Sequence, residues 1–271
     1  RFVQEAVRRN LNLTEAAKRA DNIIFFSATL TPMDYYMELY GAATEDYRMG
    51  LPSPFPTENL KVYCDYKIDT RYKVRDQSYD RISANLDLML QSKKGNYIAF
   101  FPSYRYMQSV YDVFMAQYGS KYEVRRQEAG LSEEERLAVM AEFESSREQS
   151  LLYFMVLGGV FAEGIDLKGD RLIGTALIGL GYPQFDYERE LIMNYFNEEK
   201  NLGFQYAYTY PGLNKITQAG GRVIRSETDE GIVVLMDSRY RKGEILSLLP
   251  PNWFPVKDIA DLKREIDSPK E

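Results

Sequence analysis

From about residue 60 onward, short apolar runs alternate with longer segments whose apolar residues recur at helical spacing. Runs of this length are typical of buried strands, and strands separated by helices are joined by right-handed crossovers. The expected strands are Leu60–Cys64, Tyr97–Phe101, Tyr122–Arg125, Leu151–Leu157, Arg171–Ile178 and Ile232–Met236. The expected helices are Tyr79–Leu90, Tyr104–Tyr118, Ser132–Glu144, Asp186–Glu199 and Gly203–Arg225. The alternation therefore predicts an α/β fold around a mostly parallel sheet.

The residues before this alternation carry different signals. Arg1–Ala20 has the spacing of an amphipathic helix, and the apolar run Ile23–Phe26 is typical of a buried strand, either of this sheet or of another domain's sheet. Because Arg1 opens the chain without an initiator methionine, we expect a piece of a longer protein. The expected parts are a lead-in helix and strand (residues 1–50), a main α/β domain (51–255) and a terminal helix or tail (256–271).

The composition removes several classes of chemistry. The 271 residues include no histidine and a single cysteine, Cys64. Histidine triads, Cys-His pairs, histidine metal sites and intrachain disulfides are therefore excluded, as is an iron–sulfur cluster held by this chain alone. No apolar run is long enough for a membrane helix, and no signal peptide is visible. Together with the scarcity of cysteine, these features predict a cytoplasmic protein with no membrane partner.

Ligands of parallel α/β sheets bind beyond the carboxyl ends of the strands, so the residues after each strand are the first candidates for a site. Ser103 follows one expected strand and opens a helix, where its hydroxyl either caps the helix or meets a phosphate. Glu163 and Asp166 lie in a glycine-rich segment after another expected strand. That segment is either an ordinary turn with solvated acids or a place where the backbone approaches a ligand.

A further candidate, Gln218–Arg225, lies in the last expected helix before Ile232–Met236. On a helix, Arg222 and Arg225 share one face with Gln218 one turn earlier. The Gly-Gly pair before Arg222 would let a polyanion approach that face closely. Two guanidinium groups in this arrangement suit phosphate oxygens.

Known phosphate-binding fingerprints are absent from the sequence. A Walker A loop needs Gly-x-x-x-x-Gly-Lys followed by Ser or Thr, and no Gly-Lys pair occurs in the chain. The only Asp-Glu pair, Asp229-Glu230, precedes an expected strand instead of following one. Gly179-Leu-Gly181 does not continue as a dinucleotide-binding motif. The chain therefore has arginines suited to phosphates but no phosphate cradle of its own.

In order and spacing, five segments resemble the C-terminal motor domain of XPD/DinG-type superfamily 2 helicases. They are Ser27–Leu30 (motif III), Ser53–Phe55 (the Ser-Pro-Phe loop), Asn96–Tyr104 (motif IV), Phe161–Asp166 (motif V) and Gln218–Arg225 (motif VI). The resemblance implies a RecA-like domain whose mostly parallel sheet has helices on both faces. The family's Walker A loop, Asp-Glu-Ala-His box and cluster-ligating cysteines have no counterpart here, since they belong to the first motor domain.

The resemblance also implies roles. A first motor domain in cis would supply the phosphate loop and would be the main holder of the Mg²⁺ ion. The present domain would close on the bound ATP. The groups expected to act on the γ-phosphate are Gln218, Arg222 and Arg225, with one arginine as the finger. The groups expected to bind the nucleotide or couple its state to movement are Glu163, Gly164, Asp166 and Gly221. The groups expected to contact single-stranded DNA, with movement from 5′ to 3′, are Ser103, Tyr104, Arg105 and Phe161.

Two other classes of function stay open. One is a non-enzymatic module with a helicase-like fold that only binds a nucleic acid or a protein. The Gln218, Arg222 and Arg225 set favours the motor domain over this module, because a pure binding module does not need it. The other class is a stand-alone small-molecule enzyme, which the missing histidine and the failed fingerprints disfavour. We expect this chain by itself to lack ATPase activity.

Overall fold

The computed structural model describes residues 15, 18–144, 147–158, 161, 167 and 169–268. The chain divides into two compact units. The larger unit consists of residues 52–181 and 215–271, and the smaller unit consists of residues 1–51 and 182–214. Almost all of the expected helix Arg1–Ala20 lies outside the described residues.

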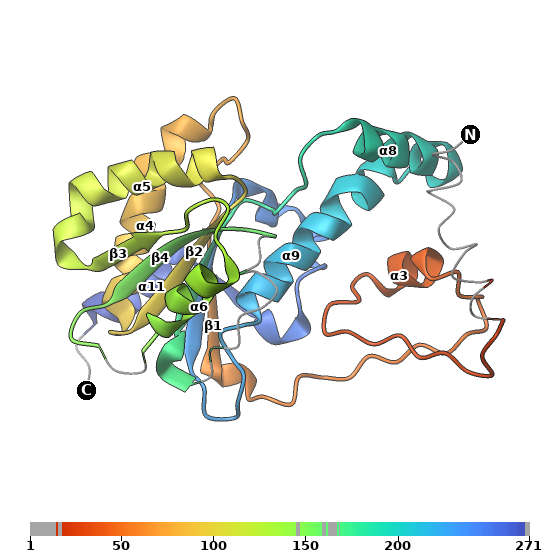
Figure 1. Cartoon of the computed structure of the whole chain (residues 1–271), viewed down its shortest axis with the longest axis horizontal. Helices are drawn as coiled ribbons and strands as arrows, with labels where there is room; N and C mark the ends of the chain where they lie inside the picture. Colours follow the sequence, from red (N-terminus) through yellow and green to blue (C-terminus); the bar gives the residue numbers. More distant parts are fainter. Residues whose placement is uncertain are drawn as a thin grey trace. The chain divides into compact units, whose positions relative to one another are not determined.

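The larger unit is built on a sheet of seven parallel strands in the order β3-β4-β2-β5-β6-β1-β7 (Figure 1). The strands are β1 (Leu60–Asp65), β2 (Asn96–Phe101), β3 (Glu123–Arg126), β4 (Leu151–Val156), β5 (Gly174–Ile178), β6 (Gly231–Met236) and β7 (Val256–Asp258). The predicted α/β class and parallel sheet are confirmed. Strand β5 begins later than expected because Gly169–Arg171 forms a 3-10 turn. Strand β7 was not predicted, since its three residues are too few to show a period.

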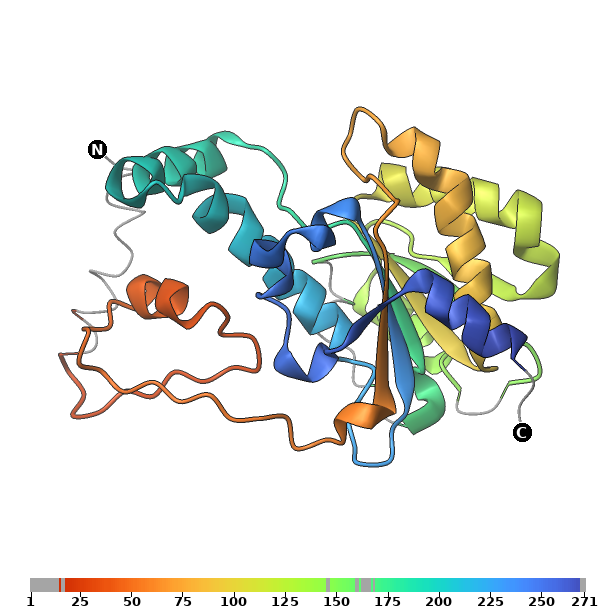
Figure 2. The same cartoon turned by 180° about the vertical axis from the view of Figure 1, so that it is seen from behind.

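Helices cover both faces of this sheet. The helices of the larger unit are α4 (Tyr79–Ser92), α5 (Tyr104–Tyr118), α6 (Glu133–Ala141), α10 (Gly243–Leu246), α11 (Ile259–Asp267) and the last residues of α9 (Tyr210–Gly220). The remaining 3-10 turns are Thr57–Asn59, Arg75–Ser78, Gly119–Lys121, Ser238–Arg241 and Pro251–Trp253. Helices α11 and α4 lie in front of the sheet in Figure 2, whereas α6 lies in front of it in Figure 1.

Burial on both faces explains why the central strands β2, β4, β5 and β6 are almost entirely apolar, whereas the edge strand β3 has the sequence Glu-Val-Arg-Arg. In β2, Tyr97, Ala99 and Phe101 belong to the core that includes side chains of α4, α5 and α11. The alternate residues Ile98 and Phe100 point to the other face and are equally buried. A strand with one solvent-exposed face would instead alternate between apolar and polar residues.

Side-chain caps set the starts of several helices. Ser132 and Glu135 form a reciprocal capping box at the start of α6. Asp186 accepts a hydrogen bond from the backbone N–H of Arg189 at 2.8 Å, so α8 begins at Tyr187. Helix α6 ends at Ala141, before the expected Glu144.

The smaller unit contains α3 (Met33–Leu39), α8 (Tyr187–Lys200), a π-helical turn (Gln205–Thr209) and the beginning of α9. Tyr35 packs edge-on against Tyr206, with 5.0 Å between ring centroids. Glu38 accepts hydrogen bonds from the hydroxyl of Tyr206 and, at 2.8 Å, from Lys200 Nζ. Aromatic packing and these hydrogen bonds hold α3 against the end of α8 and the π-helical turn that follows it.

Of the two alternatives for Ile23–Phe26, a strand of this sheet is wrong, and a strand of another domain's sheet stays a prediction. These residues form no strand in the described part of the chain, and Ile24 and Phe26 are 83% and 90% exposed. A strand needs a neighbour for its backbone hydrogen bonds, and none of the seven strands pairs with this run. Within the described residues, every helix is too short or too polar to cross a membrane.

Candidate functional site

The first turn of α5 lies beyond the carboxyl end of β2. Ser103 Oγ accepts a hydrogen bond from the backbone N–H of Tyr106 at 3.3 Å, so the hydroxyl caps the helix. Tyr104 is 40% exposed and Arg105 is exposed, so a phenol and a guanidinium face solvent at the edge where parallel sheets bind ligands. The expected contact of these three residues with nucleic acid stays a prediction.

An open cavity of about 330 Å³ lies beside this turn. Its lining residues are Tyr104, Arg105, Met107, Gln108, Arg126, Gln127, Glu128 and Ala129. Gln127 directly follows β3, and its side-chain amide bonds both Tyr104 and the end of β4. No signal in the sequence marks Gln127, because a single glutamine after a short strand matches no motif.

The glycine-rich segment after β4 is described only in part. Glu163, Gly164 and Asp166 lie outside the described residues, and their expected roles stay predictions. Phe161 is 2% exposed. A ring that stacks on a base has to be exposed, so the structure argues against Phe161 as a nucleic-acid contact and indicates a packing role.

A network around the buried Asp237 carboxylate joins the carboxyl ends of β6 and β1. Asp237 is fully buried and accepts hydrogen bonds from the Thr70 hydroxyl and from Arg239, whose backbone N, Nε and Nη2 lie 2.8, 2.8 and 2.9 Å away. The Tyr240 hydroxyl donates to the carbonyl oxygen of Gly179, directly after β5, at 3.2 Å. The loops after three neighbouring strands are therefore fixed by one network.

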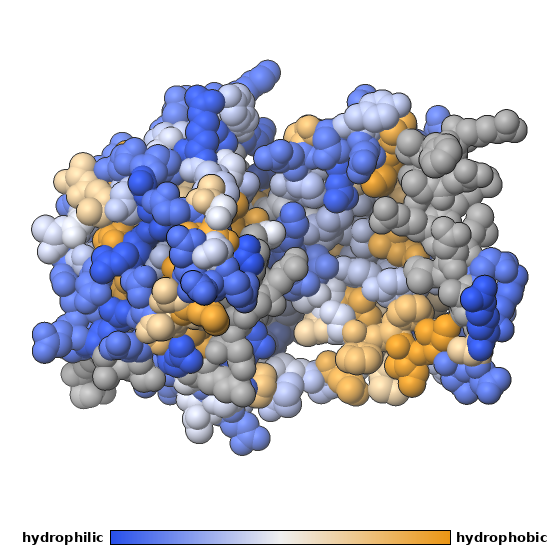
Figure 3. Space-filling model, viewed as in Figure 1, coloured by the Kyte–Doolittle hydropathy of each residue, from blue (hydrophilic) through white to orange (hydrophobic). Residues whose placement is uncertain are grey.

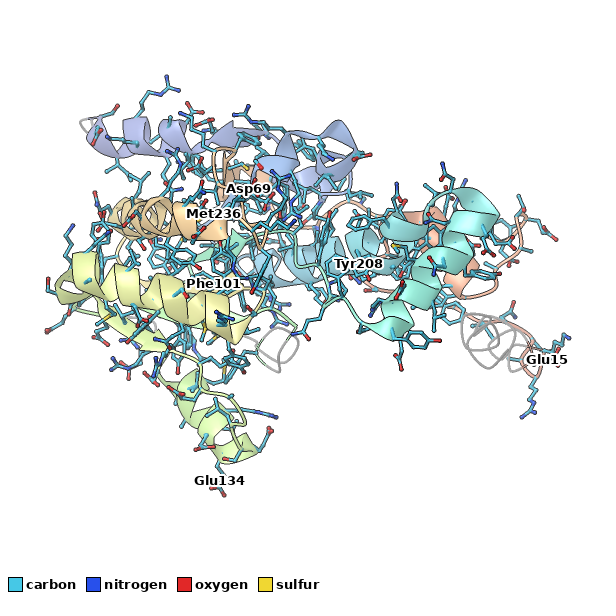
Figure 4. All side chains as sticks on the ribbon, turned by 90° about the horizontal axis from the view of Figure 1, so that it is seen from above. Glu15, Asp69, Phe101, Glu134, Tyr208 and Met236 are labelled. Carbon is cyan, nitrogen blue, oxygen red and sulfur yellow. The ribbon has the colours of Figure 1, made fainter. Side chains whose placement is uncertain are left out.

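Figure 4 labels Asp69, Met236 and Phe101, which lie near or at the carboxyl ends of β1, β6 and β2. Arg71 Nε donates to both carboxylate oxygens of Asp69, at 2.9 and 3.0 Å. These hydrogen bonds lower the pKa of the Asp69 carboxyl group. Asp69 therefore stays ionised and holds the Arg71 guanidinium beside the buried network.

The loop after β1 combines cations with aromatic rings. Its cations are Lys67, Arg71, Lys73 and Arg75. The Arg75 guanidinium carbon lies 4.7 Å from the ring centroid of Tyr72 and 4.8 Å from that of Tyr106. Such interleaving suits single-stranded nucleic acid. The density of cations was visible in the sequence, but only the fold places this loop at the same sheet edge as Tyr104.

The Gln218–Arg225 segment lies at the opposite edge, since it precedes β6 instead of following a strand. Helix α9 ends at Gly220, and Arg222 and Arg225 lie in the connection to β6. The prediction that both arginines share a helical face with Gln218 is therefore wrong. Arg222 is 6% exposed, whereas Arg225 is exposed.

The glycine pair at the end of α9 has a packing role. A Cβ atom at Gly220 would lie 2.4 Å from the Trp253 ring, so only glycine lets the buried indole approach the helix. A Cβ atom at Gly221 would lie 2.9 Å from the carbonyl oxygen of Thr217. Close packing explains Gly220 better than access for a polyanion does.

Asp229 fixes the turn that carries Arg225. Its carboxylate accepts hydrogen bonds from the backbone N–H of Arg225 at 2.7 Å and of Ser226 at 2.9 Å, and from the Ser226 hydroxyl at 2.5 Å. Asp229 is buried, so these bonds are shielded from water. The backbone of Arg225 is held while its side chain stays in solvent.

The helicase C-terminal domain family matches residues 86–256, more than half of the sequence. The chain belongs to this family. The resemblance stated from the sequence is thereby confirmed. A helicase named ATP-dependent DNA helicase CHL1, from Debaryomyces hansenii, is 25% identical over 90% of this chain and 33% of its own length. The XPD helicase subunit of the general transcription and DNA repair factor IIH, from Schizosaccharomyces pombe, is 27% identical over 88% of this chain and 32% of its own length.

The chain thus spans about a third of the length of these curated relatives. A solved XPD helicase structure superimposes with a TM-score of 0.66 at 22% identity, over 87% of this chain and 42% of that one. The Xpd4 structure of S. tokodaii superimposes with a TM-score of 0.55 at 19% identity, over 80% of this chain and 41% of that one. These structures confirm the RecA-like fold.

Proposed function

We propose that this chain is the second motor domain of an ATP-dependent DNA helicase. It closes on ATP held by a preceding domain and tracks along single-stranded DNA from 5′ to 3′. The observation that carries the proposal is the family match over residues 86–256, which includes Gln218–Arg225. Relatives that are named ATP-dependent DNA helicases support the same reading.

The nucleotide side of the proposal rests on Arg225. Its guanidinium is exposed and its backbone is fixed by Asp229, so the group reaches into solvent from a rigid base. A positioned guanidinium stabilises charge that develops on a transferred phosphoryl group. Arg222 is 6% exposed, which makes Arg225 the stronger candidate for the finger. Gln218 lies in the last turn of α9 and Gly221 directly follows that helix, a few residues before Arg225.

The preceding domain holds the Mg²⁺ in this proposal. The described residues include no group of three or more acidic or cysteine side chains that could hold a metal ion. A Mg²⁺ ion needs carboxylates together with substrate phosphates. Among the described residues, the chain's own contribution to phosphate binding is therefore positive charge.

The nucleic-acid side of the proposal rests on the carboxyl edge. Tyr104 and Arg105 follow β2, and the basic loop Lys67–Arg75 follows β1. Strands β5 and β6 lie between these two strands in the same sheet. Cations there neutralise phosphates and exposed rings stack on bases. Nucleotide and nucleic acid would thus occupy opposite edges of the same sheet, so closure at one edge changes the grip at the other.

The partner domain in cis is supported by the smaller unit. Ile24 and Phe26 are strongly exposed, and Met49 and Leu51 are exposed as well. Figure 3 shows hydrophobic side chains gathered around α3 in this unit. An apolar run of this kind suits a strand that completes a neighbouring sheet. The preceding motor domain is the occupant that we propose.

The test of the nucleotide role is Arg225→Ala in the full-length protein. We expect ATP binding to remain and steady-state ATP turnover to fall by about 10³-fold, the effect of losing an arginine finger. ATP binding is measured with a fluorescent ATP analogue, and turnover by phosphate release. Arg264→Ala is the matched control. Arg264 lies exposed on α11, and ion pairs at exposed positions, such as its pair with Asp261, contribute little to stability.

Near-normal turnover in Arg225→Ala would contradict the finger assignment. If the full-length wild-type protein binds single-stranded DNA but hydrolyses no ATP, the non-enzymatic binding module is the correct reading. Robust ATP hydrolysis by this chain alone, above the level of an Arg225→Ala preparation, would refute the need for a preceding domain.

A further inference from the structure

Gln127 is a buried amide whose hydrogen bonds join three elements. Its backbone N–H donates to the carbonyl oxygen of Phe154 in β4 at 2.8 Å. Its side-chain Oε1 accepts from the backbone N–H of Val156 at 3.0 Å, and its Nε2 donates to the Tyr104 hydroxyl at 3.0 Å. The side chain is 7% exposed, so water competes little for these bonds.

The direction of this chain of hydrogen bonds is fixed by the backbone. The Val156 N–H can only donate, so the amide atom that faces it has to be the oxygen. The amide nitrogen is then the atom that faces Tyr104, and it too can only donate. The Tyr104 oxygen therefore uses a lone pair toward Gln127. Its own proton is turned away from Gln127, toward another acceptor.

The cavity of about 330 Å³ that Tyr104 lines is suited to an anionic acceptor. Arg105 and Arg126 line the same cavity, and Glu128 offsets Arg126 through a bond of 3.1 Å. A hydroxyl proton next to surplus positive charge suits an oxygen that accepts but does not donate, such as a phosphodiester oxygen.

We propose that Gln127 is a positioning residue that aims the Tyr104 hydroxyl proton at a phosphodiester oxygen of single-stranded DNA. Gln127 acts through Tyr104 and does not touch the strand. Because it also bonds the last residue of β4, it links this contact to the strand that leads into the glycine-rich segment. This inference rests on the proposed function of the carboxyl edge.

The deciding variant is Gln127→Glu, measured in the full-length protein with fluorescein-labelled oligothymidylate. A glutamate accepts from both Val156 and Tyr104, so it turns the phenolic proton inward and removes the donor. We expect the affinity for the oligonucleotide to fall roughly tenfold, the loss expected for a hydrogen bond to a charged group. Tyr104→Phe removes the same donor and is expected to cause a similar fall. The KM for ATP is expected to stay unchanged in both.

Two further variants separate donor direction from charge and from folding. Gln117→Glu makes the same chemical change at the other end of α5 and is expected to leave affinity within about twofold of wild type. Gln127→Met has no charge, is expected to lose several-fold affinity, and is expected to add nothing to Tyr104→Phe in the double variant. Thermal unfolding checks that each variant is folded, and Tyr104→Phe keeps the test valid if Gln127→Glu is not.

Full affinity in Gln127→Glu and Gln127→Met would overturn the inference while leaving the proposed function intact. So would an additive loss in the Gln127→Met/Tyr104→Phe double variant, since two independent groups give additive effects. A loss in Gln127→Glu that disappears at high salt would also overturn it, because screening removes charge repulsion but not a missing donor. If wild type itself fails to bind the oligonucleotide, the proposed function falls first, and the inference falls with it.

Discussion

The two edges of the sheet are built in different ways. At the carboxyl edge, Asp237, Thr70 and Arg239 form a buried network, and Gln127 fixes Tyr104. At the amino edge, a short turn held by Asp229 presents the exposed Arg225. The carboxyl edge is a preorganised surface, whereas in the proposed function the amino edge contributes one guanidinium to a site that another domain completes.

This difference matches the two proposed ligands. A nucleic-acid strand needs several contacts in register, so its surface benefits from loops that do not move. A nucleotide sandwiched between two domains has to be released when the domains open, so a single projecting arginine is enough on this side. The following predictions test whether the edges differ in this way.

The largest effect on stability is expected for Asp237→Ala. The substitution leaves Arg239 without its buried partner and frees the loops after β1 and β6. We expect a loss of about 3 kcal/mol in the free energy of unfolding, measured by urea titration. Asp170→Ala, which breaks an exposed pair with Lys93, is the control and is expected to cost less than about 0.5 kcal/mol. Equal losses would show that the carboxyl edge is not specially stabilised.

Gly220→Ala tests the packing at the end of α9. The added methyl group would meet the buried Trp253 ring, and overpacking of this kind costs about 1–3 kcal/mol. Gly243→Ala is the matched control, because no heavy atom lies within 4 Å of its added Cβ. Differential scanning calorimetry should show a lower Tm for Gly220→Ala alone. An unchanged Tm for both would mean that Trp253 moves aside without cost.

Asp229→Ala loosens the turn at the amino edge. Three hydrogen bonds disappear, and we expect a loss of about 1 kcal/mol in stability. ATP turnover should fall further than that loss explains, because Arg225 is no longer held in place. Glu227→Ala, at an exposed position of the same turn, is the control. If turnover is the same in both variants, rigid placement of Arg225 is not required.

The smallest effect is expected for Glu265→Gln, on α11 beside Lys61 of β1 and Lys257 of β7. Burial alone would raise the pKa of Glu265, but hydrogen bonds from Lys257 and Lys61 outweigh it and lower the pKa to about 2. A lowered pKa stabilises the fold above the unfolded value of about 4.5, and this stability is lost as the pH falls toward 2. We expect Glu265→Gln to cost at most about 1 kcal/mol at neutral pH, because the group is partly exposed. Urea titrations at pH 7 and pH 3 should show a smaller difference for the variant. An unchanged pH dependence would contradict this.

Much of the fold could be predicted because its signals are local. Apolar runs marked β1, β2, β4, β5 and β6, and side-chain caps such as Ser103 and Ser132 fixed helix starts within one turn. The predicted helix Gly203–Arg225 failed at its end because glycine allows a helix both to continue and to stop. At this position Gly220 packs against Trp253, and a contact between residues so far apart in the sequence leaves no signal in a local pattern.

The residues of the candidate site likewise fall into those that local motifs predict and those that only tertiary contacts bring together. Tyr104, Arg105 and Arg225 were found because they lie in ordered motifs after or before strands. Gln127 was missed because its partners come from α5 and β4. The expectation that Arg222 and Arg225 share one helical face was wrong. It assumed that the helix continues to Arg225, whereas α9 ends at Gly220.

By itself, the sequence determined the α/β class, the order of the strands and helices along the chain, and the resemblance to helicase motor domains. It also excluded imidazole chemistry, since the chain has no histidine. Only the tertiary structure decided which motif lies at which edge, which arginine is exposed and which groups are fixed by buried partners. The physical reason is distance along the chain. Periodicity and capping act within a few residues, whereas Thr70 and Asp237 meet across 167 positions, and the packed fold alone brings them together.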